Sequence, residues 1–388
     1  MSRPDPPIAV TRLDWVDLRL DDVETPRGRL RITLGLGSGL ARRASDPPGV
    51  LWAIGDRGPN IKINAAIDDH GLKRLKPLRG VDGAKLMPRT DIGPTLVQIR
   101  LEGDGVTLLR TLPLRDSHGA AFSGLPLPVG DTAAMEPAFD LAGAPLGANL
   151  AGADTEGVVA LEDGTFRVAD EYGPSILVVA ADGEVLARWV PTGVEAGLMG
   201  AAYPVIGVLP ALAARRRLNR GFEAIALSPD ERRLYVLLQS PLAAEDDPEA
   251  DAVGYVRLWT LDATTGMALA EHLYPLDPAD SFRRDRDAGR VRSKDLKVSE
   301  AVAVGDGQLL ILERISRTSK IYRVKLSERL LRKTLVLSTD DWPDIDADLE
   351  GMAVLSDREL VLCTDNDFGV DGRQTAFYRV TFAESFAA

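Results

Sequence analysis

The feature that most constrains the fold is a unit of short apolar runs separated by tight turns. Its clearest copy spans residues 154–191, where Asp163-Gly164 and Asp182-Gly183 separate β-rich runs and Tyr172-Gly173-Pro174-Ser175 supplies a third turn. Asp-Gly between apolar runs is a strong signal for a β-hairpin. The unit therefore predicts four short antiparallel strands. Because four such strands cannot bury a core alone, we expect further copies of the unit along the chain.

Four other segments align with this unit and begin near residues 28, 219, 299 and 348. The last copy ends one strand short, and the N-terminal run 8–20 is left over. Pairing of the two chain ends would close the ring and leave no exposed sheet edge. The pattern predicts an all-β fold, a β-propeller of four-stranded antiparallel blades. Five blades are visible, and a sixth remains open.

The repeats predict a single propeller domain over residues 1–388. Two segments fall outside them and are expected to form insertions or long connections over one face. Residues 60–93 separate the second and third strands of the first copy, and residues 116–152 are rich in Gly, Ala and Pro. A sixth blade would have to lie in the second of these segments or in residues 1–36.

Composition limits the classes of partner. The formal net charge is −12, and the one basic cluster that stands out is Arg215-Arg216-Arg217, which argues against nucleic acid. One cysteine, Cys363, and three histidines exclude an internal disulfide and a Cys/His zinc site, so oxygen would have to hold any metal ion. The sequence lacks the ~18-residue apolar run of a membrane span, and residues 1–7 lack the apolar core of a signal peptide. Without a signal-peptide pattern, the sequence taken alone predicts a cytoplasmic protein.

Acidic residues occupy matching places in the copies. At the start of the first strand the alignment places Ser38, Glu156, Glu223, Glu300 and Glu350. The second strands end at Asp56, Asp170, Gln239, Glu313 and Asp365, followed by Arg57, Glu171, Ser240, Arg314 and Asn366. Because the first two strands form an antiparallel hairpin, both sets should meet at one mouth of the channel.

Carboxylates crowded into one mouth repel each other and attract a cation. Oxygen ligands at variable spacing favour Ca²⁺, whereas Mg²⁺ and Mn²⁺ are less favoured because they need a stricter octahedron. The predicted metal ligands are Glu156, Glu223, Glu300, Glu350, Asp56, Asp170 and Asp365. The alternative for each acid is a structural role, in which it caps a turn or accepts backbone hydrogen bonds between blades.

Residues beside the acidic ring provide candidates for catalysis and binding. Arg57 and Arg314 are expected to orient an anionic substrate, and Glu171 or Glu313 to act as general base. The expected substrate-binding residues are Arg220, Gln239, Asn366 and Asp367.

The order of these motifs resembles the bacterial family named for an esterase-like activity of phytase. The motifs are Ser38-Gly-Leu with Asp56-Arg-Gly-Pro, Asp154-x-Glu-Gly with Asp170-Glu-Tyr-Gly-Pro-Ser, Asn219-Arg-Gly-Phe-Glu with Leu238-Gln-Ser-Pro-Leu, Ser299-Glu with Glu313-Arg, and Asp348-x-Glu-Gly with Asp365-Asn-Asp-Phe-Gly. The resemblance implies a propeller fold, hydrolysis of phosphate or other esters, and a periplasmic or secreted location.

The resulting hypothesis is a metal-dependent hydrolase that acts on a phosphate ester or a related small ester at the channel mouth. Two alternatives stay open. One is a propeller lactonase or carboxylesterase that uses the same ion to polarise a carbonyl. The other is a non-catalytic propeller that binds a protein or glycan and is stabilised by the ion. The sequence does not determine the oligomeric state.

Overall fold

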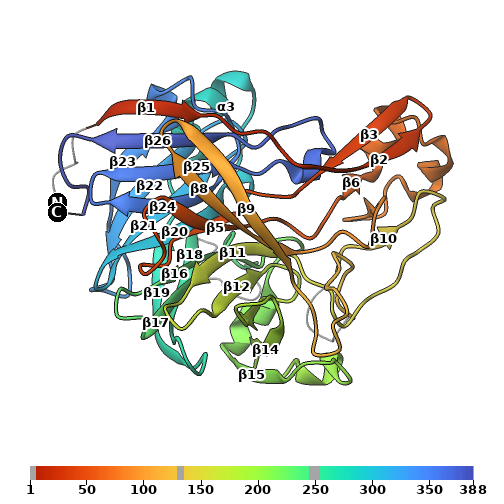
Figure 1. Ribbon diagram of the computed structural model, residues 1–388, viewed down its shortest axis with the longest axis horizontal. Helices are drawn as coiled ribbons and strands as arrows, with labels where there is room; N and C mark the ends of the chain where they lie inside the picture. Colours follow the sequence, from red (N-terminus) through yellow and green to blue (C-terminus); the bar gives the residue numbers. More distant parts are fainter. Residues whose placement is uncertain (1–5, 129–134, 244–253, 388) are drawn as a thin grey trace.

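The architecture is all-β, as the computed structural model in Figure 1 shows for residues 6–128, 135–243 and 254–387. The helices of these ranges are short, with six residues at most. They are α1 (Ile63–Asp68), α3 (Arg283–Ala288), η1 (Lys73–Leu78), η2 (Glu195–Leu198), η3 (Ala211–Arg215), η4 (Ala279–Ser281), η5 (Ser293–Asp295), η6 (Thr339–Asp341) and η7 (Asp367–Gly369). Each of them is too short to traverse a bilayer.

Five antiparallel sheets follow the predicted copies in chain order. The first contains β4 (Gly39–Ala41), β5 (Val50–Ile54), β8 (Thr95–Glu102) and β9 (Gly105–Pro113). The second contains β11 (Thr155–Ala160), β12 (Phe166–Asp170), β13 (Ser175–Val179) and β14 (Val185–Pro191), with β15 (Val205–Leu209) added in parallel. The third contains β16 (Phe222–Leu227), β17 (Arg233–Leu238), β18 (Tyr255–Asp262) and β19 (Ala268–Pro275).

The fourth and fifth sheets complete the series. The fourth contains β20 (Lys297–Gly305), β21 (Gln308–Arg314), β22 (Ser319–Lys325) and β23 (Lys333–Ser338). The fifth contains β24 (Leu349–Ser356), β25 (Glu359–Thr364) and β26 (Phe377–Phe382), and its fourth strand is β1 (Pro7–Leu13). The predicted pairing between strands from the two chain ends is therefore present, since β1 runs antiparallel to β26.

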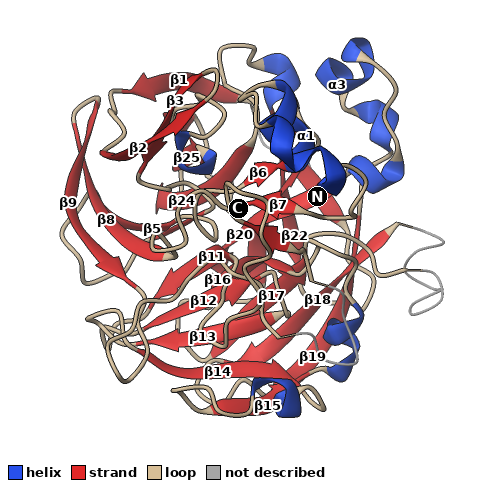
Figure 2. Cartoon of the chain, turned by 90° about the vertical axis from the view of Figure 1, so that its right-hand side faces the viewer, coloured by secondary structure: helices blue, strands red, loops and turns tan. Residues whose placement is uncertain are grey.

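The first strand of each sheet lies toward the middle of the molecule. In Figure 2 the second sheet runs outward from β11 to β15 at the edge. The first strands contact one another in the order β4, β11, β16, β20, β24, and β24 also contacts β4. Small residues permit this approach: a Cβ at Gly157 would lie 2.7 Å from the carbonyl oxygen of Glu223. The starts of the five first strands are therefore held close together.

Apolar side chains fill the spaces between neighbouring sheets. The largest buried cluster joins Ile176 and Trp189 of the second sheet to Phe222 and Trp259 of the third. Phe222 and Trp259 meet edge to face, with ring centroids 6.1 Å apart. Burying such rings removes a large apolar area from water and stabilises the contact between the sheets.

A smaller layer covers the end of the sheets at which the first strands begin. It contains the hairpin β2 (Arg19–Thr25) and β3 (Gly28–Thr33) and a sheet of β6 (Ile61–Lys62), β7 (Lys85–Leu86) and β10 (Ala138–Phe139). Strands β2, β3, β6 and β10 lie together at the right of Figure 1. Ile32, Ile67 and Leu86 share a core there with Phe368. This layer is therefore packed against the chain that follows β25.

The layer also holds the segments expected outside the repeats. Residues 60–93 form β6, α1, η1 and β7, and β7 pairs in parallel with β10 from the segment 116–152. Residues 129–134 of that segment lie outside the described residues. The predicted strand near residue 28 exists as β3, but it pairs with β2 and not with the first sheet. The run 8–20 is divided between β1 and the start of β2.

Candidate functional site

In four of the sheets, a β-bulge at the start of the first strand leaves one residue without a partner on the second strand. The strand registers shift between Thr155 and Gly157, Phe222 and Ala224, Val298 and Glu300, and Leu349 and Gly351. The residues inside the shifts are Glu156, Glu223, Ser299 and Glu350. A bulge leaves one residue unpaired and changes the direction of its side chain. Glu156, Glu223 and Glu350 line one cavity of about 330 Å³.

In the fourth sheet this place belongs to Ser299, so the predicted alignment of Glu300 is wrong by one residue. Glu300 pairs with Leu312, where the other sheets have glycine or alanine. Its carboxylate accepts the N–H of Leu40 at 3.2 Å and the N–H of Ala301 at 2.9 Å. Burial raises the pKa of Glu300 well above its ordinary value. These contacts fit the structural alternative and place Glu300 outside the residues that line the cavity.

The same register identifies the matching residues at the ends of the second strands. Asp170, Leu238, Glu313 and Thr364 lie opposite the residues that precede the four bulges. The next residue in each case, and Asp56 in the first sheet, lines the cavity: Asp56, Glu171, Gln239, Arg314 and Asp365. The predicted alignment is therefore one residue early in the second and fourth sheets, at Asp170 and Glu313.

Asp170 and Glu313 are structural acids with several partners. The carboxylate of Asp170 accepts hydrogen bonds from the Ser175 hydroxyl at 2.6 Å and the Asp154 N–H at 2.8 Å, and lies 3.4 Å from the Arg188 guanidinium. Glu313 accepts from the Tyr274 hydroxyl at 2.5 Å and forms an ion pair with Lys333. Neither acid lines the cavity, so neither stands where a metal ligand or general base is needed.

Seven carboxylates form three overlapping groups at the cavity. Within each group one oxygen per residue lies within 4.8 Å of the others. The groups are Asp56, Asp365 and Asp367; Glu156, Glu171 and Glu223; and Asp56, Asp154 and Glu156. Asp367, predicted to bind substrate, thus lies with two predicted metal ligands. Asp154 was missed as a candidate, although it begins the Asp154-x-Glu motif.

Several of these oxygens are buried without a hydrogen-bond partner among the described residues. They are Glu171 Oε1, Glu223 Oε2, Asp365 Oδ1 and both oxygens of Asp154, although Asp154 Oδ2 lies 2.7 Å from the Arg57 guanidinium. Burial and the nearby Glu223 raise the pKa of Glu171 to about 7. Burial, followed by the charge of Asp367, raises the pKa of Asp365 well above its usual range. Such groups are stabilised in their charged form by a cation, and a set made only of oxygen ligands suits Ca²⁺.

The two predicted arginines line the cavity but already contact several acids. Arg57 lies 2.7 Å from Asp154 and 3.2 Å from Asp56, and it also forms an ion pair with Glu136. Although burial opposes it, the charge of Arg57 helps to lower the pKa of Asp56. Arg57 therefore neutralises part of the negative charge of Asp56, Asp154 and Glu136.

Arg314 stands on the opposite side of the cavity. It donates to the Ser299 hydroxyl at 2.8 Å, lies 3.0 Å from Asp348 and forms an ion pair with Glu350. The carboxylate of Glu350 is thus paired with Arg314, and Glu350 belongs to none of the three carboxylate groups. The bulge residue of the fifth sheet positions Arg314 and does not extend the acidic cluster.

The four predicted substrate-binding residues have different surroundings. Gln239 lines the cavity, and its buried Oε1 has no hydrogen-bond partner in the part of the chain that the structure describes. Arg220 lines an adjoining cleft. The side chain of Asn366 is used internally, since it donates to the Leu34 carbonyl at 3.0 Å and accepts the Phe368 N–H at 3.0 Å. Asn366 therefore fixes the turn that carries Asp365 and Asp367.

Lys297 is a cavity residue that is absent from the predicted site residues. It is the first residue of β20, pairs with Arg314 and lines both the cavity and the adjoining cleft. The positive charge of Arg314, together with burial, lowers the pKa of Lys297 to about 8. No repeated position marks it, because the charged run before it hides the start of the strand.

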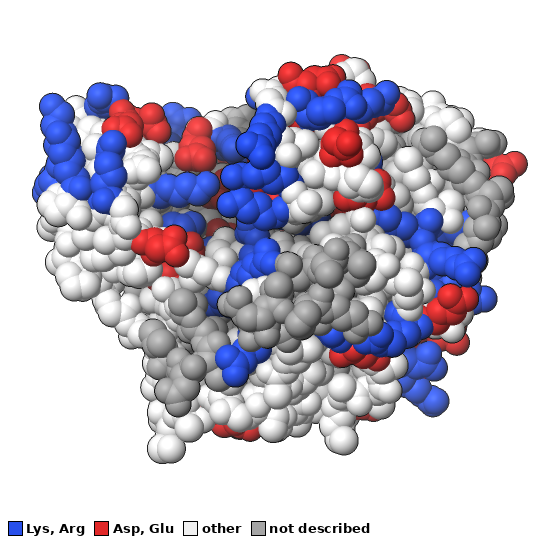
Figure 3. Space-filling view, turned by 180° about the vertical axis from the view of Figure 1, so that it is seen from behind, with Lys and Arg blue, Asp and Glu red and all other residues white. Residues whose placement is uncertain are grey.

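The adjoining cleft is basic, in contrast to the cavity. It has a volume of about 550 Å³, and the cations that line it are Lys62, Lys85, Arg217, Arg220, Lys294 and Lys297. Glu136 is its one acidic lining residue among the described residues, and it is paired with Arg57 and lies 3.7 Å from Lys85. Figure 3 shows Lys and Arg side chains gathered on this face of the molecule. Lys62, Lys85, Asn219 and Lys297 line both spaces.

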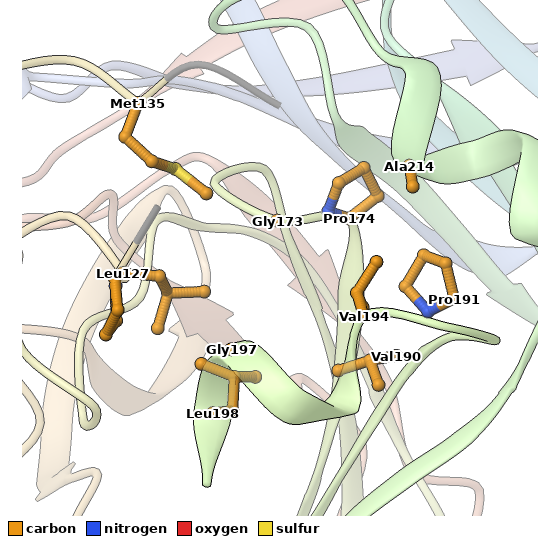
Figure 4. Close-up of a pocket in the computed structure, with 11 residues that line it drawn as sticks. Leu127, Met135, Gly173, Pro174, Val190, Pro191, Val194, Gly197, Leu198 and Ala214 are labelled. Atoms are coloured by element: carbon orange, nitrogen blue, oxygen red, sulfur yellow. The ribbon is translucent and has the colours of Figure 1, made fainter. Parts of the chain in front are cut away.

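A separate apolar pocket lies beside the second sheet (Figure 4). Leu127, Pro174, Val190 and Leu198 are among the residues that line it, and its volume is about 50 Å³. Its described lining residues carry no charged side chain. The chemistry is therefore concentrated in the cavity and the cleft.

Comparisons with known proteins identify several similar chains. An uncharacterized secreted protein of Arthroderma benhamiae is 26% identical over 314 residues, which cover 74% of this chain and 60% of the relative. The chain thus spans about three-fifths of that relative. The structure of the calcium-binding protein regucalcin from Agrobacterium tumefaciens is 14% identical, with a TM-score of 0.39 over 99% of this chain and 98% of the other.

A second similar structure is a gluconolactonase from Xanthomonas campestris. It is 9% identical, with a TM-score of 0.35 over 98% of this chain and all (100%) of the other. The family match is one of sequence and extends over most of the chain. The profile described as Phytase-like, esterase-like activity of phytase, matches residues 32–368, and the chain belongs to this family.

Proposed function

We propose that the protein is a cation-dependent hydrolase of small anionic esters, with phosphate esters as its substrate class. The observation that carries this proposal is the contact between two oppositely charged spaces. Buried carboxylate oxygens that have no hydrogen-bond partner among the described residues belong to acids that line the cavity, and six cations line the cleft that shares a wall with it. The cavity suits a cation, and the cleft suits the negative charge of a substrate.

The ligands of the cation are proposed to be the grouped carboxylates, among them Asp56, Glu156, Glu171, Glu223 and Asp365. Glu171, expected as a general base, is reassigned to this set because it groups with Glu156 and Glu223. When bound, Ca²⁺ would supply a Lewis acid for the phosphoryl oxygen and lower the pKa of a coordinated water. Lys297 and Arg314 can donate hydrogen bonds to an anionic oxygen at the opposite side.

The basic cleft favours a phosphate ester over a neutral lactone. Lysine and arginine side chains concentrate anions and bind phosphate oxygens. The protein as a whole has a formal charge of −12, so this local excess of positive charge is not a consequence of composition. A neutral ester would gain little from these cations.

The fold proposed for this function is a five-bladed propeller. It is supported by the contacts of the five first strands in a ring and by the β1–β26 pair. Segments 60–93 and 116–152 would then be additions to one domain at the end that carries the cavity. We also propose that the protein is exported, as its relative from Arthroderma benhamiae is named a secreted protein.

The test compares hydrolysis of p-nitrophenyl phosphate, p-nitrophenyl acetate and a simple lactone by the full chain. We expect turnover of the phosphate ester that is lost with EDTA and restored by Ca²⁺. The double variant Lys62→Ala with Lys294→Ala should raise KM for the phosphate ester a few-fold, since each exposed cation contributes about 0.2–1 kcal/mol. Arg233→Ala, at an exposed ion pair with Asp306, is the control.

Two outcomes would contradict the proposal. Faster turnover of the lactone or the acetate would assign the site to neutral esters. No turnover of any ester, combined with a large loss of thermal stability in EDTA, would assign a non-catalytic propeller whose ion is structural.

A further inference from the structure

We propose that the cavity holds two separate divalent cation sites, one between the first and fifth sheets and one between the second and third. The first would be formed by Asp56, Asp365 and Asp367, and the second by Glu156, Glu171 and Glu223. This inference deepens the proposed function and rests on it for the role of the ions. The number of ions can be measured without turnover.

The carboxylates are divided between the two sites by the fold. Asp56 follows β5, whereas Asp365 and Asp367 lie in the turn after β25. Glu156 and Glu223 are the bulge residues of β11 and β16, and Glu171 follows β12. The two groups of three share no residue. Each site therefore joins one neighbouring pair of sheets.

One ion would not satisfy both groups. Ca²⁺ binds oxygens at about 2.3–2.6 Å, so all its ligand atoms must lie within about 5 Å of one another. Within each group the oxygens meet this condition, since they lie within 4.8 Å of one another. Across the described residues the six carboxylates form two such groups and not one group of six. The geometry is thus that of two neighbouring centres.

Each group has its own oxygen that lacks a partner among the described residues, on an acid that lines the cavity. In the first group it is Asp365 Oδ1, and the Asp365 residue is 7% exposed. In the second group they are Glu171 Oε1 and Glu223 Oε2, on residues 1% and 2% exposed. A buried carboxylate oxygen without a donor is unfavourable unless a cation binds it. Since this applies to both groups independently, filling one site leaves the other unsatisfied.

A third group connects the two sites. Asp56 belongs to the first site and Glu156 to the second, and both group with Asp154. Asp154 is held 2.7 Å from Arg57, which also lies 3.2 Å from Asp56 and 4.0 Å from Glu171. The positive charge of Arg57 therefore reduces the repulsion between the carboxylates of the two sites. Hydrolases of phosphate esters commonly use a pair of ions to hold the attacking and leaving oxygens.

The experiment counts the ions bound by the full chain. Protein stripped with EDTA is titrated with Ca²⁺ by calorimetry, and the bound metal is counted by native mass spectrometry. We expect two Ca²⁺ per chain for the natural sequence. Asp365→Asn with Asp367→Asn should bind one, and Glu171→Gln with Glu223→Gln should also bind one, with the affinity of the remaining site changed less than tenfold. The control Asp371→Asn, an exposed acid at the rim, should bind two.

The outcomes separate this inference from the proposed function. A single Ca²⁺ that is lost in both double variants would overturn the two-site inference even if the protein hydrolyses phosphate esters. Two Ca²⁺ without turnover would keep the two sites and remove the hydrolase. If a double variant does not fold, as judged by circular dichroism, crystals of the natural protein with Mn²⁺ decide the matter: two anomalous peaks support the inference and one peak contradicts it.

Discussion

Asp170 and Glu171 are neighbours in the chain and are both fully buried, but their surroundings differ. Asp170 is surrounded by donors from Ser175, Asp154 and Arg188. Glu171 faces the cavity, and its Oε1 has no donor. Consecutive residues after a strand point in different directions, so one acid turns into the protein and the other into the cavity. Burial is therefore common to both acids, and the feature that distinguishes Glu171 is an oxygen without a partner among the described residues.

The same contrast occurs at the matching positions of the fourth sheet. Glu313 is held by Tyr274 and Lys333, whereas Arg314 lines the cavity. The inward position thus carries an acid in one sheet and a cation in another. Under the proposed function, this difference would give the mouth a side that binds a cation and a side that binds an anion.

The largest effect expected from this comparison is on stability. Asp170→Asn leaves the buried Arg188 without its carboxylate partner, and breaking a buried pair lowers the free energy of unfolding by about 3–5 kcal/mol. Urea unfolding followed by circular dichroism measures this loss. Ca²⁺ binding by the folded fraction should be unchanged. Asp182→Asn, in an exposed pair with Arg115, is the control and should lose less than about 1 kcal/mol.

Removing an acid with an unpartnered oxygen among the described residues should instead weaken Ca²⁺ binding and leave the fold stable. Glu223→Gln deletes one charge from its group, and we expect Ca²⁺ affinity to fall about 100-fold, or about 2.7 kcal/mol. Without the ion the variant should be more stable than the natural protein by about 1 kcal/mol, because a buried charge is gone. Calorimetry and thermal melts in EDTA measure the two effects. A less stable ion-free variant with normal affinity would place Glu223 among the structural acids.

The raised pKa of Glu171 should make the stability of the ion-free protein depend on pH. Its pKa is about 7 in the folded protein and near 4.5 when exposed, so ion-free protein takes up a proton on folding between these values. The stability of the ion-free protein should therefore fall as pH rises from about 4.5 to 7. Below pH 7, Ca²⁺ affinity should fall up to tenfold per pH unit as the proton competes. Melts in EDTA across this range test both signs, and Glu171→Gln should flatten the curve.

The smallest effect is expected for Glu300, which has a raised pKa like Glu171 but hydrogen-bond donors like Asp170. Its pKa is raised by burial, but its oxygens accept the N–H groups of Leu40 and Ala301. Glu300→Gln keeps the shape and one acceptor, so the free energy of unfolding should change by about 1 kcal/mol or less. Ca²⁺ affinity should stay within about three-fold of the natural value. A loss as large as that of Glu223→Gln would return Glu300 to the metal ligands.

The sequence predicted the sheets better than the direction of single side chains. The Asp-Gly turns are strong local signals, and Gly164 and Gly183 adopt the positive φ values of 91° and 92° that they require. Asp170, Glu300 and Glu313 were each aligned one residue away from their structural counterparts. In each case an acidic residue stands directly beside the matching position, and a shift of one residue moves a side chain to the other face.

Two site residues carried too little local signal. Asp154 has no acidic counterpart at the same place in every copy, and Lys297 follows a run of alternating charges. Asp154 contacts Arg57 of another sheet, and such a contact depends on the arrangement of the sheets and cannot be read from one copy of the repeat. Lys297 pairs with Arg314 inside its own sheet, but the charged run before it hides the start of the strand.

The layer formed by β6, β7 and β10 has a consequence for how this protein could diversify. Lys62 and Lys85 of the basic cleft stand on that layer, whereas Glu156 and Glu223 stand on the sheets. Changes in the length or charge of residues 60–93 would alter which molecules are admitted and leave the carboxylates in place. Under the proposed function, selectivity for the substrate and binding of the cation would thus depend partly on separate stretches of sequence, which could evolve independently of each other.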